Sequence, residues 1–178
     1  VLSERPTDMS YFSAIHFAQQ EDYTEEYTKT VYLTGETFPS ITEVMNHFKV
    51  IVIDDFDTKI LTEEQKNALL EWIKQGGICV IGTGVNAQKT LEGLQNIISV
   101  SCDSVVNQYI RMAGTRVRAD VAQLEIQQDN SEAIENASIL PVGSGSVVLY
   151  DISLSLSPAT ETTGFINEIR DCCESLSS

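Results

Sequence analysis

Residues 50–84 read VIVIDDFDTKILTEEQKNALLEWIKQGGICVIGTG, and this stretch decides the fold. The apolar run at 50–53 ends in acidic residues and is typical of a strand buried on both faces. A helical pattern follows, and a second apolar run at 78–81 ends in Gly-Thr-Gly. Strand, helix and strand in this order predict one parallel β-α-β unit, around which the rest of the chain is arranged.

The helix between the two apolar runs carries its own start and stop signals. Thr62 and Gln65 have the spacing of a capping box, and Glu63 and Glu64 complement the positive end of the helix dipole. Gly76 is placed to supply the left-handed turn that ends the helix. The apolar residues with helical spacing, which we expect to be buried, are Ala68, Leu69, Trp72 and Ile73.

Weaker patterns surround this unit. Before it we expect a strand at 1–2, a helix whose buried side holds Met9, Phe12 and Ile15, a strand at 27–33 and a short helix at 41–48. After it we expect a short helix at 86–96, β-rich pieces at 105–112 and 119–126, a polar loop at 129–137, a strand at 147–156 and a closing amphipathic helix from 165 to 176. The order predicts one α/β domain over residues 1–178. The fold is expected to have three layers, in which helices cover both faces of a doubly wound, mostly parallel sheet. The part at 99–140 is expected to be irregular and β-rich.

Composition limits the partners. The 178 residues carry 26 acids against 11 bases, a net charge of -15, which disfavours nucleic acid and anionic lipid. No run of 18 apolar residues is present, so this piece is not expected to insert into a membrane. The chain begins with Val1 rather than Met, and we expect it to be part of a longer protein. The four cysteines contain no Cys-x-x-Cys pair, so no zinc site is predicted.

Ligands of such folds bind beyond the carboxyl ends of the strands, where the loops 3–8, 54–58 and 82–86 are expected to meet. The candidate ligand-binding residues there are Asp54, Asp55, Asp57, Thr83 and Asn86. Clustered carboxylates suit Mg²⁺, and the alternative is that these acids cap the strand end and the helix approach. No catalytic residue, no metal ligand and no cofactor is assigned.

Three further patterns bear on catalysis. Gly82 and Gly84 could form an anion cradle or simply a tight turn, and Thr83 between them is a poor nucleophile without a neighbouring base. His16 and His47 both fall in predicted helices away from the three loops, so a Cys-His or Ser-His pair is hard to build. Residues 55–59 also resemble the D-x-D-x-T/V motif of haloacid-dehalogenase phosphatases, except that Lys59 stands where Thr or Val is required.

Several fragments together resemble one family. They are 54–58 (DDFDT), 61–65 (LTEEQ), 69–84 (LLEWIKQGGICVIGTG), Pro39 and 143–151 (GSGSVVLYD). This set resembles the class I glutamine-amidotransferase-like (flavodoxin-like) domains of exported, membrane-anchored bacterial proteins. Amidotransferases of this class place Cys at the elbow after the strand and a His-x-Glu later, whereas this chain has Thr83 there and no histidine after His47. The resemblance therefore implies a non-catalytic member on the extracytoplasmic side, tethered through flanking segments.

The resulting functional expectation is a non-catalytic binding or scaffolding domain of a bacterial cell-surface or membrane-anchored protein. Its partner would be a protein or a small molecule. The alternative is a divalent-metal-dependent hydrolase or phosphatase that uses Asp55 and Asp57.

Overall fold

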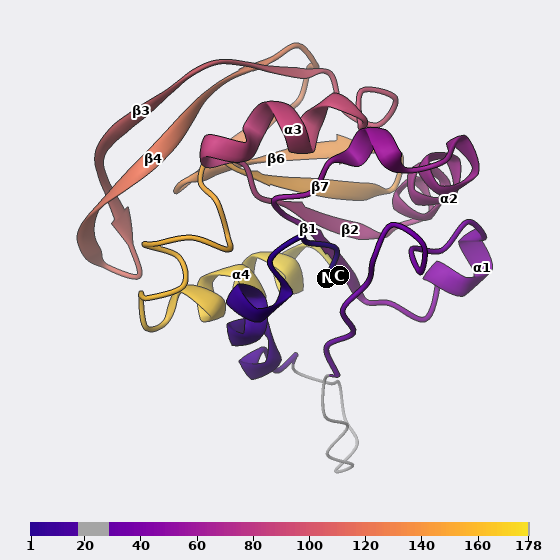
Figure 1. The fold of residues 1–178 in the computed structure, drawn as a ribbon, viewed down its shortest axis with the longest axis horizontal. Helices are drawn as coiled ribbons and strands as arrows, with labels where there is room; N and C mark the ends of the chain where they lie inside the picture. The colour runs from indigo at the N-terminus through magenta and orange to yellow at the C-terminus, as the bar shows by residue number, and fades with distance from the viewer. Residues whose placement is uncertain (18–28, 178) are drawn as a thin grey trace.

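The computed structural model describes residues 1–17 and 29–177 (Figure 1). The helices are the 3₁₀ helices η1 (Pro6–Ala14), η2 (Thr58–Ile60) and η3 (Gly84–Asn86) and the α-helices α1 (Thr42–Met45), α2 (Glu63–Lys74), α3 (Ala87–Glu92) and α4 (Phe165–Leu176). The strands are β1 (Val50–Ile53), β2 (Ile78–Ile81), β3 (Val100–Met112), β4 (Thr115–Ile126), β5 (Glu132–Ile134), β6 (Ala137–Val142) and β7 (Gly145–Tyr150).

The predicted β-α-β unit at 50–84 is confirmed. β1 and β2 pair in parallel with Val50 opposite Ile78, and α2 connects them. The capping box of α2 is formed in both directions: Gln65 N donates to Thr62 Oγ1 at 3.1 Å, and Thr62 N donates to Gln65 Oε1 at 2.8 Å. Gly76 has a φ of 115°, the left-handed value that ends the helix.

The central sheet has the strand order β1-β2-β7-β6-β5. β1 pairs with β2, and β2 with β7, in parallel, whereas β6 is antiparallel to both β7 and β5. The prediction of a doubly wound, mostly parallel sheet is therefore wrong, because half of this sheet is an antiparallel meander. The cause is a two-residue turn at Gly143 and Ser144, since so short a connection can join only antiparallel strands.

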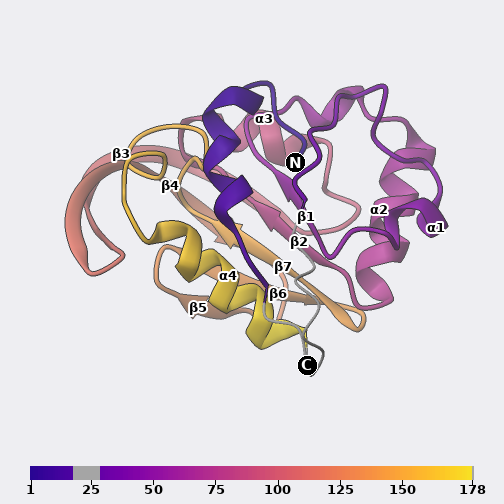
Figure 2. The ribbon, with the colours of Figure 1, turned by 90° about the horizontal axis from the view of Figure 1, so that it is seen from below.

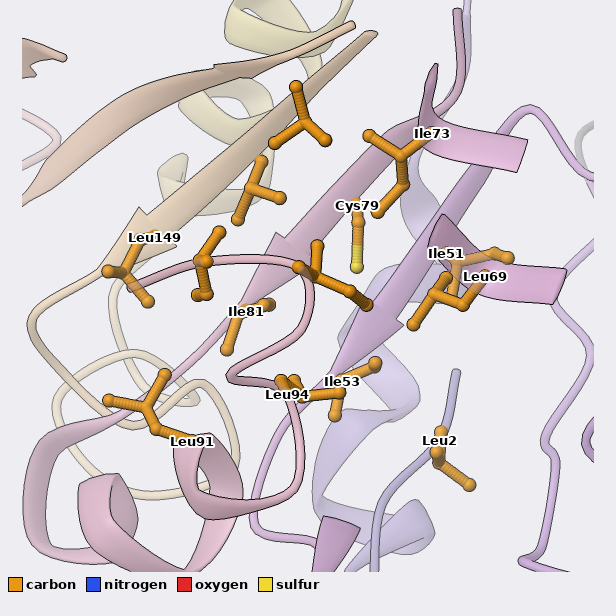
Figure 3. Packing of buried hydrophobic residues seen from close by; sticks show 14 of the residues in the cluster. Leu2, Ile51, Ile53, Leu69, Ile73, Cys79, Ile81, Leu91, Leu94 and Leu149 are labelled. Atoms are coloured by element: carbon orange, nitrogen blue, oxygen red, sulfur yellow. The ribbon is translucent and has the colours of Figure 1, made fainter. Parts of the chain in front are cut away.

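Helices cover both faces of the sheet. On one face, the side chains of β1, β2 and β7 pack against α2 and α3, with Ile53, Ile81 and Leu149 fully buried (Figure 3). On the other face, Val52, Val80 and Val148 pack against η1 and α4 through Met9, Phe12, Phe165 and Ile169. The closing amphipathic helix and the buried side of the N-terminal helix are thus confirmed, although the latter is a 3₁₀ helix.

The N-terminal segment joins this sheet only at single residues. Leu2 forms parallel bridges to Leu33 and to Ile53, and it is completely buried. Residues 29–33 of the predicted strand 27–33 therefore contribute one bridge instead of a strand, and its first two residues lie outside the described part. Within the described ranges, no helix has the length and apolar character needed to cross a bilayer.

Strands β3 and β4 form a separate two-stranded antiparallel sheet of 13 and 12 residues, here called the arm. Figures 1 and 2 show it curving along the rim of the molecule. β4 lies against the body, with Ala119, Val121 and Ala122 buried, whereas β3 is exposed over most of its length. The tip is anchored by Met112, which is fully buried, and by Ala113 N, which donates to Glu168 Oε1 of α4 at 2.8 Å.

Candidate functional site

The three loops expected to meet at the carboxyl ends of the parallel strands do meet. Glu4 N donates to Asp55 O at 3.0 Å, and a Cβ on Gly82 would collide with Asp54 Oδ1. A fourth segment, 151–155 after β7, closes over them. We call the residues Asp54, Asp55, Thr83, Lys89 and Ser153 the strand-end cluster.

Asp54 is buried and bonded to the chain itself. Its Oδ1 accepts from Leu154 N at 2.7 Å, and Ser153 Oγ lies 3.5 Å from Oδ2. Burial raises the pKa of this carboxyl, and hydrogen bonds from Ser155 and Leu154 act in the opposite direction. The carboxylate therefore holds the segment after β7 in place.

Asp55 faces a lysine. It is 7 % exposed, has a left-handed φ of 46°, and accepts a hydrogen bond from Lys89 Nζ, which also bonds Glu4 Oε2 at 2.7 Å. Burial works to lower the pKa of Lys89, but its bonds to Asp55 and Glu4 outweigh burial and raise it. The negative charge of Asp55 is thus balanced by the ammonium group of Lys89. Through its bonds to Asp55 and Glu4, this lysine also joins α3 to the loop before η1.

Thr83 occupies the elbow after β2 and is completely buried. Its Oγ1 donates to Tyr150 O at 2.6 Å and its N donates to Ile152 O at 2.9 Å. Gly84 has a φ of 63°, and a Cβ there would lie 2.7 Å from Ser153 N. These contacts favour the tight structural turn over the anion cradle, because the backbone after β7 fills the space in front of the elbow.

The remaining two candidates do not join the cluster through side-chain bonds. Asp57 caps η2, with its Oδ1 accepting from Lys59 N at 3.2 Å. Asn86 precedes α3 without a side-chain capping bond. In residues 1–17 and 29–177, no group of three or more His, Cys, Asp or Glu side chains is arranged to hold a metal ion.

Sequence reasoning missed two contributors to this region. The run Ser153-Leu-Ser155 alternates like a strand, but β7 ends at Tyr150 and the serines turn back over Asp54. Lys89 lies on α3, three residues beyond the loop 82–86. Its position in the first turns of the predicted helix was the available signal that its side chain could reach Asp55.

A cavity of about 510 Å³ lies elsewhere, between η1, the segment 29–31, the segment 47–52 and α4. Its wall is mostly apolar, with Phe12, Ile15 and Phe48, and Lys49 Nζ lies 4.5 Å from the centroid of the Phe17 ring. None of the five predicted site residues lines it. The sequence offered no sign of it, because Phe12 and Ile15 fit the pattern of ordinary core residues.

The arm carries the second candidate surface. Arg116 and Arg118 of β4 lie over the ring of Tyr109, with guanidinium carbons 3.9 and 4.7 Å from its centroid. Arg118 Nε also donates to Asn107 Oδ1 at 2.8 Å. Among the described residues, neither these two arginines nor Arg111 forms an ion pair with a carboxylate. A basic, aromatic face is therefore exposed on a strongly acidic protein.

Comparisons with known proteins place the fold. No protein-family model and no curated protein matches the sequence. The structure resembles "Cytoplasmic Protein STM1381" from Salmonella typhimurium LT2, with a TM-score of 0.71 and 12 % identity over 99 % of this chain and 89 % of that one. It also resembles "Cytoplasmic Protein STM3548" from Salmonella typhimurium, with a TM-score of 0.64 and 14 % identity over 92 % and 81 %.

A third similar structure belongs to a much larger enzyme. The exo-β-1,4-mannosidase Op5Man5 from Opitutaceae bacterium strain TAV5 matches with a TM-score of 0.57 and 10 % identity over 96 % of this chain. The chain spans only 30 % of the mannosidase. At these identities the likeness is one of fold.

These findings correct two predictions. The resemblance to amidotransferase-like, flavodoxin-like domains is wrong, because the sheet is mixed and the matched Salmonella proteins are of another description. The prediction of an extracytoplasmic, membrane-tethered location is likewise wrong, since both of those similar structures are described as cytoplasmic proteins.

Proposed function

We propose that this chain is a non-catalytic binding domain that associates with another polypeptide through its arm. This proposal rests on a difference between the strand-end cluster and the arm in how many hydrogen-bonding groups remain available to another molecule. The strand-end cluster directs its polar groups at its own chain, whereas β3 has one edge without a partner strand in the described part of the molecule.

The exposed side chains of the arm support the proposal. Val105, Val106 and Tyr109 are 40 %, 42 % and 52 % exposed, and all three lie on β3. Aromatic and arginine side chains are enriched where proteins bind one another, and an open strand edge offers main-chain hydrogen bonds. The net charge of -15 argues against nucleic acid as the ligand of this basic face.

The alternative hydrolase needs Asp55 and Asp57 to share a divalent cation. The Lys89 ammonium on Asp55 and the η2 cap made by Asp57 compete with such a cation. A thermal-unfolding series with Mg²⁺, Mn²⁺ and Ca²⁺ separates the two functions. We expect no shift in Tm for the wild type beyond that of the Asp55→Asn/Asp57→Asn double variant.

A ligand at about 100 times its Kd adds about 2.7 kcal/mol, enough to move Tm by several degrees. A metal-dependent shift of that size in the wild type, absent in the double variant, would favour the hydrolase. The binding function itself is tested by placing a photo-crosslinking phenylalanine derivative at Tyr109, with Asn67 on the exposed side of α2 as the matched control position.

Illumination should yield a cross-linked product from position 109 and none from position 67, in the purified chain where the partner is a second copy and in an extract of its source cells where it is a different protein. The absence of any product from position 109 in both preparations would refute the proposed function. The mass of the product distinguishes a second copy of the chain from a different protein.

A further inference from the structure

We propose, building on the proposed function, that the partner of the arm is a second copy of this chain, paired β3 to β3 in antiparallel register about Asn107. The resulting dimer has a two-fold axis at Asn107 and joins the two arms into one four-stranded sheet. Three features of the arm lead to this arrangement: the direction of its free backbone groups, the self-complementary order of its side chains, and the position of its basic residues.

The backbone direction follows from the turn. Ala113 and Gly114 have φ values of 49° and 75° and separate the paired residues Met112 and Thr115, which is the geometry of a two-residue type I′ hairpin. Met112 and Thr115 then form a hydrogen-bonded pair. Because such pairs alternate along an antiparallel ladder, residues 105, 107, 109 and 111 direct their N–H and C=O groups away from β4.

One contact checks this assignment. Asn136 Nδ2, from the turn between β5 and β6, donates to Arg111 O at 2.6 Å, so the carbonyl of an odd-numbered residue does face away from β4. The groups of residues 105, 107 and 109 are left for a partner strand. Such an exposed edge of a long strand is a template for pairing unless it is blocked.

The side-chain order matches a second copy. The edge reads Asp103-Ser-Val-Val-Asn-Gln-Tyr-Ile-Arg111. An antiparallel copy centred on Asn107 sets Asn107 opposite itself and Val105 opposite Tyr109, and the latter pair occurs twice. The pairing ends there, because Asp103 lies at a β-bulge and Asn136 occupies the outward carbonyl of Arg111. An aromatic residue opposite a β-branched one is a favourable cross-strand pair.

Neighbouring registers lose this match. Shifting the centre to Val106 sets Val105 opposite Asn107, and shifting it to Gln108 sets Tyr109 opposite Asn107. Of these three registers, only the one about Asn107 pairs Val105 with Tyr109. Arg116 and Arg118 do not oppose this pairing, because they lie on β4 and are separated from their counterparts by both β3 strands.

Paired charge substitutions at Val105 and Tyr109 test the register. Sedimentation equilibrium of the wild-type chain should show a reversible dimer. Val105→Lys or Tyr109→Glu alone removes both Val105–Tyr109 pairs and should raise the dimer Kd about tenfold at low salt. The double variant Val105→Lys/Tyr109→Glu sets an ammonium opposite a carboxylate in both pairs and should return the Kd to near the wild-type value.

Both positions are exposed and lie outside the core, and circular dichroism checks that each variant is folded. A wild type that stays monomeric at every soluble concentration would overturn the inference, as would single variants that dimerise like the wild type. A double variant as weak as the singles would overturn the register. A monomeric wild type that still cross-links a different protein from position 109 would leave the proposed function standing and refute the homodimer alone.

Discussion

The strand-end cluster and the arm use polar residues in opposite ways. In the cluster, Asp54 and Thr83 are completely buried; Asp54 accepts from Leu154 N, and Thr83 donates to Tyr150 O and Ile152 O. In the arm, Tyr109 and Arg111 are exposed, and the outer backbone groups of β3 have no partner strand in the described residues. The first arrangement stabilises the fold, and the second leaves bonding capacity for another molecule.

This contrast separates two kinds of evidence for function. Acidic residues at the end of a buried strand suggest a ligand site when only the sequence is considered. A buried carboxylate needs hydrogen-bond donors, however, and here the same chain supplies them. An exposed strand with an open edge has no structural need for Val105, Val106 and Tyr109 at its surface. Variants in the cluster should therefore change stability, and variants on the outer edge of the arm should change association.

The largest expected effect comes from adding one methyl group to the cluster. Gly82→Ala would place a Cβ against Asp54 Oδ1 and 2.8 Å from Leu154 Cγ, both of which are buried. Overpacking and the loss of the Asp54 bond to Leu154 N should together lower the free energy of unfolding by about 4 kcal/mol. Urea denaturation measures this loss.

Gly114→Ala at the tip of the arm is the matched control. No atom lies within 4 Å of the added Cβ, so only the left-handed φ of 75° is penalised, at a cost of about 1–2 kcal/mol. If the two alanine variants were equally stable, the cluster would not be the tightly packed region described above.

A smaller effect is expected for Thr83→Val, which keeps the shape of the side chain and removes the hydroxyl. Tyr150 O loses its buried donor, so the free energy of unfolding should fall by about 1–2 kcal/mol. Thr115→Val, at an exposed position of β4, should change it by less than about 0.5 kcal/mol. If Thr83→Val left the free energy of unfolding unchanged, the Thr83 hydroxyl would not be needed for stability, and a functional role of this position would have to be considered.

The smallest effect concerns pH. Burial raises the pKa of Asp151, at the end of β7, to about 6 from 3.8. The folded state then binds a proton more readily than the unfolded state, so this residue's contribution to stability rises as the pH falls from about 6 to about 4. At neutral pH its charged carboxylate is destabilising.

Asp151→Asn should therefore be more stable than the wild type at pH 7.5 by about 1 kcal/mol, after allowing for the part of the carboxylate that solvent screens. The difference should vanish near pH 4. Urea denaturation of both proteins across this range tests the sign, and a difference that is independent of pH would contradict it.

Local signals account for what could be predicted from the sequence. The stretch 50–84 carries its own caps, apolar face and turn glycine, so β1, α2 and β2 were placed correctly. The meander β5-β6-β7 depends on short turns, which set neighbouring strands antiparallel. The sequence did not predict β6, because Pro141 interrupts the alternation of apolar and polar residues that is typical of a strand. The sheet was consequently predicted to be parallel where it is antiparallel.

The candidate site could likewise be predicted only as far as local sequence signals reach. Asp54, Asp55 and Thr83 were found because residues at the ends of parallel strands converge, but their bonds to Leu154, Lys89 and Tyr150 are long-range and leave no local signal. For the arm, the sequence predicted β-rich segments but not a long two-stranded sheet with an exposed edge. Its exposed strand lacks the one-sided apolar pattern by which strands are recognised, and that exposure is the property on which its proposed role depends.

The most direct test of the account is a comparison of Asn107→Pro with Asn107→Ala by sedimentation equilibrium. Both variants remove the side-chain bonds of Asn107 to Asp120 and Arg118, but only proline removes the N–H that points away from β4 to the two-fold axis. We predict that the alanine variant dimerises like the wild type and that the proline variant is a folded monomer. Equal dimerisation of the two variants, or a wild type that never dimerises, would contradict the claim that the outer edge of β3 binds a second copy of the chain.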